Sequence, residues 1–172
     1  DRMTRDHGWR LLSVGRLIER LAGMATALAT LLEAFDERGG STATTELLLE
    51  LFDSRITFRA RYQRHEDLLA LADLLVQDDT NPRAFAGTLR RLRTELGKLP
   101  GTDAARAALH ELLPAQGAGL SLAELATGND GAMRQRLVAL ARRLQVSAAG
   151  LSDAIGQRYF AHADGRDDLQ WV

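Results

Sequence analysis

Arginine and carboxylate side chains cluster near the start of this sequence. Residues 15–20 read GRLIER, so Arg16, Glu19 and Arg20 are separated by three and four positions. On a helix, this spacing brings side chains onto neighbouring turns of one face. An arginine held by one carboxylate can present its guanidinium to a second carboxylate. Three interpretations follow: exposed ion pairing on a helix surface, an ionic lock between helices, or a patch that binds a ligand.

Three further stretches combine arginine with acidic or amide side chains: TRDHGWR at 4–10, DSRITFRARY at 53–62 and QDDTN at 77–81. Each is typical of a polar helix face or a capped loop, and each can also form an arginine–aspartate cluster. With GRLIER they supply the candidate binding residues Arg5, Asp6, Arg16, Glu19, Arg20, Asp53, Arg59, Arg61, Asp78 and Asn81.

The sequence offers little for catalysis or metal binding. It has no cysteine, and none of its four histidines forms an HExxH or HxH pair. The sequence also lacks a glycine-rich phosphate loop, a GxSxG motif and the paired Glu-x-x-His motifs of di-iron bundles. We therefore expect no catalytic residue, metal or cofactor, and an independent enzyme is the least supported function.

Composition describes an ordinary globular chain. The 172 residues are 45% hydrophobic and carry a formal net charge of -1. Neither a nucleic-acid partner nor a membrane surface is expected, because both require a basic excess on one face. No apolar run reaches the length of a membrane helix, so a cytoplasmic protein is the default. Because the chain begins at Asp1 without methionine, we expect it to be a piece of a longer protein.

The hydrophobic pattern predicts an all-α fold: a single bundle of five to seven helices within residues 1–172, with long first and last helices. The first helix is expected from about residue 6 to residue 38, where Gly39-Gly40 ends it. Beside its apolar seam, Gly15, Ala22 and Ala29 form a column of small residues that would let another helix approach closely. The apolar seam itself consists of Leu11, Val14, Ile18, Leu21, Ala25, Leu28, Leu32 and Phe35.

Other boundaries follow from capping signals. His65 is expected to open a helix, and Asn81 is expected to cap another that has Pro82 at its first position. Ser121 and Glu124 have capping-box spacing. A long helix should run from about residue 132 to residue 160, followed by a frayed tail at 163–172.

Together these stretches resemble the alpha-E domains, helical domains named for a motif that contains Glu-Arg. The resemblance is carried by TRDHGWRLLSVGRLIER, LLLELFDSRITFRARY and LLVQDDTNPRAFAGTLRRLRTEL in this order. It is good over about residues 1–100 and weaker beyond. Alpha-E domains usually begin with an earlier helix that has its own motif of this kind, so this chain is similar to their C-terminal part. If the two helices normally face each other, half of a shared site is absent here.

The resemblance implies a setting more than an activity. Alpha-E domains accompany circularly permuted ATP-grasp amidoligase-like proteins in bacteria, so such a domain, fused or separate, is the implied partner. The function implied is a non-catalytic accessory module in peptide ligation or processing, which binds a partner protein or a peptide or amino-acid carboxylate. In this interpretation Glu19 accepts hydrogen bonds from Arg59 or Arg61, which leaves Arg16 or Arg20 free. The alternative is a structural domain in which the cluster is a buried lock of helix register. A homo-oligomer of this chain is a further candidate assembly.

Overall fold

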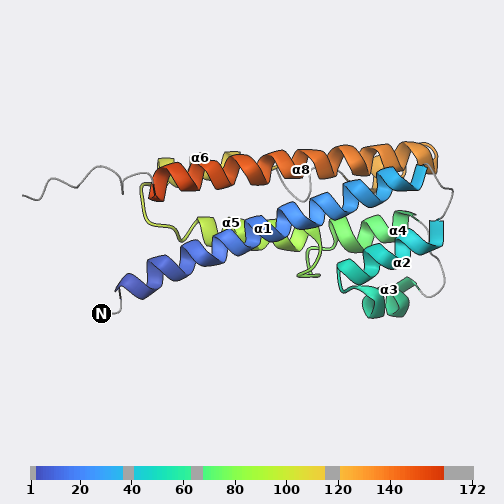
Figure 1. The fold of residues 1–172 in the computed structure, drawn as a ribbon, viewed down its shortest axis with the longest axis horizontal. Helices are drawn as coiled ribbons and strands as arrows, with labels where there is room; N and C mark the ends of the chain where they lie inside the picture. The colour runs from blue at the N-terminus through green and yellow to red at the C-terminus, as the bar shows by residue number, and fades with distance from the viewer. Residues whose placement is uncertain (1–2, 37–40, 63–67, 115–120, 161–172) are drawn as a thin grey trace, which may run out of the picture.

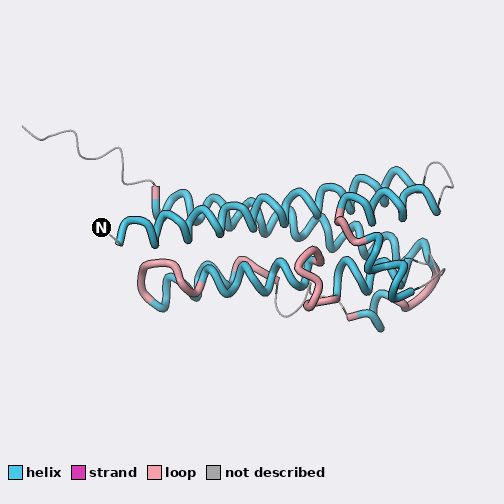
Figure 2. The backbone as a smooth tube through the Cα atoms, turned by 90° about the horizontal axis from the view of Figure 1, so that it is seen from below, coloured by secondary structure: helices cyan, strands magenta, loops and turns pink. Residues whose placement is uncertain are grey.

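The computed structural model describes residues 3–36, 41–62, 68–114 and 121–160. These residues form eight α-helices and one π-helical segment, and they contain no strand (Figure 2). The all-α class is therefore confirmed. The elements are α1 (Met3–Asp36), α2 (Ser41–Leu51), α3 (Arg55–Tyr62), α4 (Leu68–Ala72), η1 (Asp73–Gln77), α5 (Phe85–Leu96), α6 (Asp103–Glu111), α7 (Leu122–Leu125) and α8 (Asp130–Tyr159).

The two longest helices, α1 and α8, run antiparallel and form the framework of the bundle (Figure 1). Helix α1 packs mainly on α8 and then on α5. Within the column of small residues, Gly15 faces a groove shared with α8, and Ala29 is fully buried. Arg142 of α8 donates to the Glu33 carboxylate through Nε and Nη2, and Gln145 Nε2 donates to Thr26 Oγ1 at 2.8 Å. Both contacts join α8 to the C-terminal half of α1.

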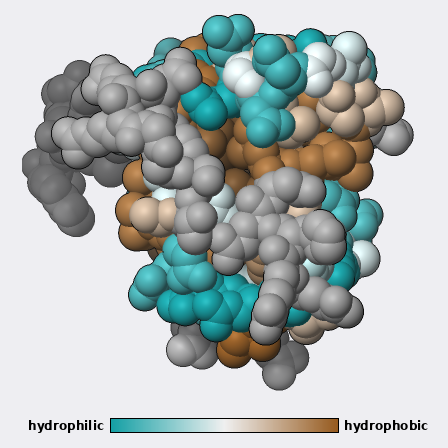
Figure 3. All heavy atoms as spheres, turned by 90° about the vertical axis from the view of Figure 1, so that its right-hand side faces the viewer, coloured by the Kyte–Doolittle hydropathy of each residue, from teal (hydrophilic) through white to brown (hydrophobic). Residues whose placement is uncertain are grey.

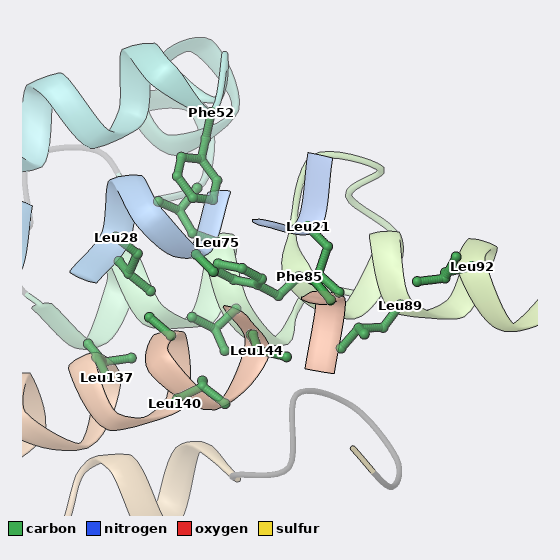
Figure 4. Close-up of a cluster of buried hydrophobic side chains, with 14 of the residues drawn as sticks. Leu21, Leu28, Phe52, Leu75, Phe85, Leu89, Leu92, Leu137, Leu140 and Leu144 are labelled. Carbon is green, nitrogen blue, oxygen red and sulfur yellow. The ribbon is translucent and has the colours of Figure 1, made fainter. Parts of the chain in front are cut away.

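The core follows the apolar seam that the sequence predicts. All members of the seam from Val14 to Leu32 are buried, and Leu11 is partly buried. Phe85 of α5 lies among leucines of α1 and α8, including Leu21 and Leu144 (Figure 4), and its ring meets that of Phe52 edge to face at 5.8 Å. At the end of the bundle where α1 stops and α8 begins, apolar residues are visible between hydrophilic regions (Figure 3). One continuous core thus joins α1, α2, α5 and α8.

Several helix ends use the expected local signals. Ser121 and Glu124 form the predicted capping box of α7, and Asn129 caps α8 through its side-chain oxygen. Helix α2 ends in a Schellman motif, in which Ser54 N donates to Leu49 O at 2.8 Å and Asp53 N to Glu50 O at 2.9 Å. Asp53 occupies the left-handed position of this motif with φ 47°. This residue separates α2 from α3.

The expected start of the helix after residue 81 is wrong. Helix α5 begins at Phe85 with Ala84 at the cap, and Asn81 lies four residues before it. Instead, the Asn81 side-chain oxygen accepts from Arg83 N at 3.0 Å, and the Asn81 carbonyl accepts from Ala84 N at 3.0 Å. These bonds close a turn where a helix was expected. The predicted features at Gly39-Gly40, at His65 and in the tail at 163–172 lie outside the described residues.

Candidate functional site

The charged residues of GRLIER lie on the outer face of α1. Arg16, Glu19 and Arg20 are all exposed, as the apolar periodicity predicts. Within the part of the chain that the structure describes, none of the three side chains makes a hydrogen bond or an ion pair. The described structure therefore does not contain the buried ionic lock that was one interpretation of these residues. The two guanidinium groups and the carboxylate are free to meet a partner.

A groove lies beside these charges, between the N-terminal half of α1 and the C-terminal half of α8. It encloses about 570 Å³ and is lined mainly by apolar atoms, among them those of Leu11, Ile18 and Ile155, with Arg16 and Glu19 also on its wall. The two helices diverge toward the end at which α1 begins (Figure 1). A volume of this size falls in the range of ligand and peptide sites.

Exposed apolar side chains surround this groove. Phe160, at the C-terminal cap of α8, is 61% exposed, and Leu12 on α1 is 46% exposed. Trp9 stands one turn before Leu12 and is 62% exposed. Large apolar side chains gathered on one face, with unpaired charges beside them, are typical of a protein-binding surface.

Glycines keep the groove open. Gly8 and Gly15 of α1 and Gly156 of α8 all line it, and a Cβ atom added to any of them would have no neighbour within 4 Å. The backbones of both helices are therefore accessible to a partner that packs closely. Sequence reasoning noted Gly15 but missed the α8 wall. The spacing of Ser152 and Gly156, two small residues four positions apart, is the signal that could have indicated it.

A second group of candidate residues forms a separate cluster, which holds loops together. Asp78 accepts hydrogen bonds from the backbone N and the hydroxyl of Thr80, and its other oxygen pairs with Arg61 Nη1 at 2.7 Å. The Asp78 side chain is only 8% exposed. Asn81 Nδ2 donates to Leu74 O at 3.3 Å and lies 3.5 Å from Ser54 Oγ. These bonds tie the turn before α5 to α3 and to η1.

The charges in this cluster are matched, and their pKa values shift accordingly. Burial alone would raise the pKa of Asp78, but hydrogen bonds from Thr80 and Arg61 outweigh burial and lower that pKa below its usual value. The hydrogen bond to Asp78 raises the pKa of Arg61 in turn. Burial and the hydrogen bond to Asp73 raise the pKa of Tyr62. Both oxygens of the Asp78 carboxylate are thus engaged within the fold, Oδ1 by Thr80 and Oδ2 by Arg61.

The expected pairing of Glu19 with Arg59 or Arg61 is wrong. Arg59 Nη2 binds Glu46 Oε1 at 3.1 Å, and Arg61 binds Asp78. Both arginines lie on α3, which packs against α2 at the far side of the molecule from the N-terminal half of α1 (Figure 1). Asp53 is taken by Arg83, whose Nη2 lies 2.5 Å from Asp53 Oδ2 and whose Nη1 donates to the Asp53 carbonyl at 3.0 Å.

The structure thus divides the candidate residues into two groups. Arg16 and Glu19 line the groove, and Arg20 is exposed on the same helix. The second group takes part in contacts between elements and consists of Asp53, Arg59, Arg61, Asp78 and Asn81. The side chains of Arg5 and Asp6 lie outside the described residues. Among the described residues, no three histidine or acidic side chains gather as metal ligands. No helix of the described part is long and apolar enough to cross a membrane.

A comparison with known families supports the resemblance carried by the GRLIER helix. Residues 1–160 match Alpha-E, described as a predicted alpha-helical domain with a conserved ER motif. The chain belongs to the Alpha-E family. Glu19-Arg20 supplies a Glu-Arg pair, and the structure places it on an exposed helix face of this Alpha-E chain.

Curated relatives extend well beyond the matched region. An uncharacterised protein of Mycobacterium bovis and one of Mycobacterium tuberculosis are each 30% identical to the Alpha-E chain over 101 residues. The match covers 59% of this chain and 11% of each relative, so the chain spans only a small part of their length. No solved structure gives a significant match.

Proposed function

We propose that this Alpha-E chain is a non-catalytic binding module that docks a partner protein at the groove between α1 and α8. The observation that carries the proposal is the unpaired state of Arg16 and Glu19 beside an open apolar groove. Charged side chains with no internal partner add little to the stability of the fold. Next to exposed Trp9 and Leu12 they supply the polar edge of a docking surface.

The partner that we propose is an ATP-grasp amidoligase-like protein of a bacterial peptide ligation or processing system in the cytoplasm. Membership of the Alpha-E family supports this choice, because the family resemblance described above implies ATP-grasp amidoligase-like partners. The long mycobacterial relatives, of which this region is 11%, are consistent with a module inside larger proteins. In this proposal Arg16 receives a carboxylate that the partner or its peptide substrate presents.

The test is a calorimetric titration of the amidoligase-like partner with the chain and with Arg16→Ala. We expect the variant to bind roughly ten- to a hundredfold more weakly, since a hydrogen bond to a charged group contributes about 1.5–3 kcal/mol. Arg91→Ala is the matched control, because Arg91 is an exposed arginine on α5, away from the groove. Equal affinities for the chain and Arg16→Ala would refute the proposal.

Thermal unfolding separates binding from folding in this test. Arg16→Ala and Glu19→Gln are expected to shift Tm by no more than about 2 °C, because a surface substitution changes stability by about 0.5 kcal/mol or less. A fall in Tm on the order of 10 °C for Glu19→Gln would instead support the structural alternative, in which Glu19 holds two helices together.

A further inference from the structure

The outer face of α1 carries a second stripe of residues, which stays exposed although Gln145 of α8 reaches one member, Thr26. Its members alternate in spacing between three and four positions, which is the seven-residue repeat of helices that pair lengthwise. The stripe consists of Trp9, Leu12, Arg16, Glu19, Gly23, Thr26 and Thr30, and all seven are exposed. The stripe thus has the periodicity of a helix–helix contact, and among the described residues no helix packs along its length; the side-chain hydrogen bond that it receives from another helix is that of Gln145 with Thr26.

The composition of this stripe is self-complementary. Two copies of α1 that run antiparallel, centred between Arg16 and Glu19, place Arg16 of each opposite Glu19 of the other. The same register places Leu12 opposite Gly23, where a Cβ atom would meet nothing within 4 Å. It also places Trp9 opposite the smaller Thr26. Large side chains therefore face small ones, and opposite charges face each other.

Other arrangements of the two helices lose these matches. A parallel pair would set Arg16 against Arg16 and Glu19 against Glu19, and like charges in contact are repulsive. Sliding the antiparallel pair by one heptad would leave Arg16 opposite Leu12 or Thr26. One register alone pairs both charges, so the charges also specify the orientation.

We propose that the chain forms a homodimer in which α1 and its copy pack antiparallel along this stripe. The inference goes beyond the proposed function, because it names a second copy of the chain as an occupant of the same surface. The contact from Trp9 to Thr26 spans about 26 Å of helix. In this dimer each α1 also lies along the α1–α8 groove of the other copy, near Phe160 and Ile155. The result is an intermolecular four-helix arrangement of two α1 and two α8 helices.

The deciding experiment is a charge-reversal cycle followed by sedimentation equilibrium over a range of concentrations. Arg16→Glu and Glu19→Arg should each weaken the dimer by more than roughly tenfold, because each creates two like-charge contacts. An equimolar mixture of the two variants should form a heterodimer, since every contact then joins a Glu to an Arg. The double variant R16E/E19R should dimerise like the parent chain, and Arg91→Glu on α5 is the control that should change nothing.

Cysteine cross-linking tests the antiparallel orientation of the two α1 helices. The chain has no native cysteine, so each introduced cysteine is the only one present. A mixture of Leu12→Cys and Gly23→Cys chains should form a disulfide-linked dimer on oxidation. Leu12→Cys alone should not, because the two copies of residue 12 are offset by about 16 Å along the helix axis.

A chain that stays monomeric at its highest soluble concentration would overturn the inference, as would a mixture of the two reversals that fails to associate. If dimerisation fails while Arg16→Ala still weakens binding of the amidoligase-like protein, the proposed function stands without the dimer. If the reversal cycle behaves as expected while that binding is unaffected, the dimer stands and the proposed function fails.

Discussion

Asp78 and Glu19 are both acidic candidate residues, but their surroundings differ. The Asp78 carboxylate is 8% exposed and binds Thr80 and Arg61. Glu19 is exposed and has no partner among the described residues. The first residue therefore stabilises the fold, whereas the second is available for binding. At the residue scale, burial and hydrogen bonding distinguish structural charges from functional ones.

Removing the Asp78 carboxylate should destabilise the protein at neutral pH. Asp78→Ala leaves Thr80 N and Arg61 without their acceptor, which costs about 1–3 kcal/mol. Because the folded-state pKa is lowered, the contribution of Asp78 is complete above its unfolded pKa of about 3.9 and is lost as pH falls through the folded value. The gap in Tm between the parent and Asp78→Ala should therefore narrow below pH 4.

Thermal unfolding of both proteins across this pH range checks the expectation. Asp153→Ala is the control, because Asp153 is exposed on α8. The interpretation of Asp78 as a loop-holding residue would fail if both variants had the same Tm at pH 7.

At the scale of elements, close packing between a turn and a helix explains where α5 starts. The turn at 78–84 lies directly against the first turns of α5, and it approaches the helix closely at Gly87. A Cβ atom there would overlap the Asn81 carbonyl oxygen and lie 3.1 Å from its carbon. Capping propensity favours a helix at Asn81, but the Asn81 side chain is used to hold Leu74 O and Arg83 N.

Two glycine substitutions should therefore have opposite effects. Gly87→Ala should lower stability by about 1–3 kcal/mol, because rigid backbone must move to make room for the methyl group. Gly150→Ala should raise stability by about 0.5–1 kcal/mol, since its Cβ would meet nothing within 4 Å and alanine favours the helix. Denaturant titration gives both free energies of unfolding. A Gly87→Ala protein as stable as the parent would contradict this description of the turn.

At the scale of the whole molecule, α1 and α8 share one core with α5 and η1 but leave one side of α1 uncovered. The inner seam of α1 is buried, whereas its outer stripe from Trp9 to Thr30 is exposed. The inner face of α1 therefore contributes to the core, and its outer face is available for binding. The core should therefore tolerate truncation far less well than the exposed apolar residues.

Phe85→Ala tests the centre of that core. Phe85 is fully buried and contacts the Phe52 ring, so its truncation should cost about 3–5 kcal/mol and lower Tm by roughly 6–20 °C. Val146→Ala should lower Tm by no more than about 2 °C, because Val146 is 74% exposed. Differential scanning calorimetry of the two variants measures this difference. Equal losses would mean that Phe85 does not lie at the centre of the core.

The sequence by itself determined the all-α class, the inner seam of α1, the α7 capping box and the exposure of Arg16, Glu19 and Arg20. These features depend on local periodicity and local hydrogen bonds, which nearby residues decide. Tertiary structure alone decided that Arg59 and Arg61 bind Glu46 and Asp78, where Glu19 was the expected partner. It also decided that α8 supplies the other wall of the groove. A partner for a charge depends on how distant helices pack, and spacing along one helix carries no information about that packing.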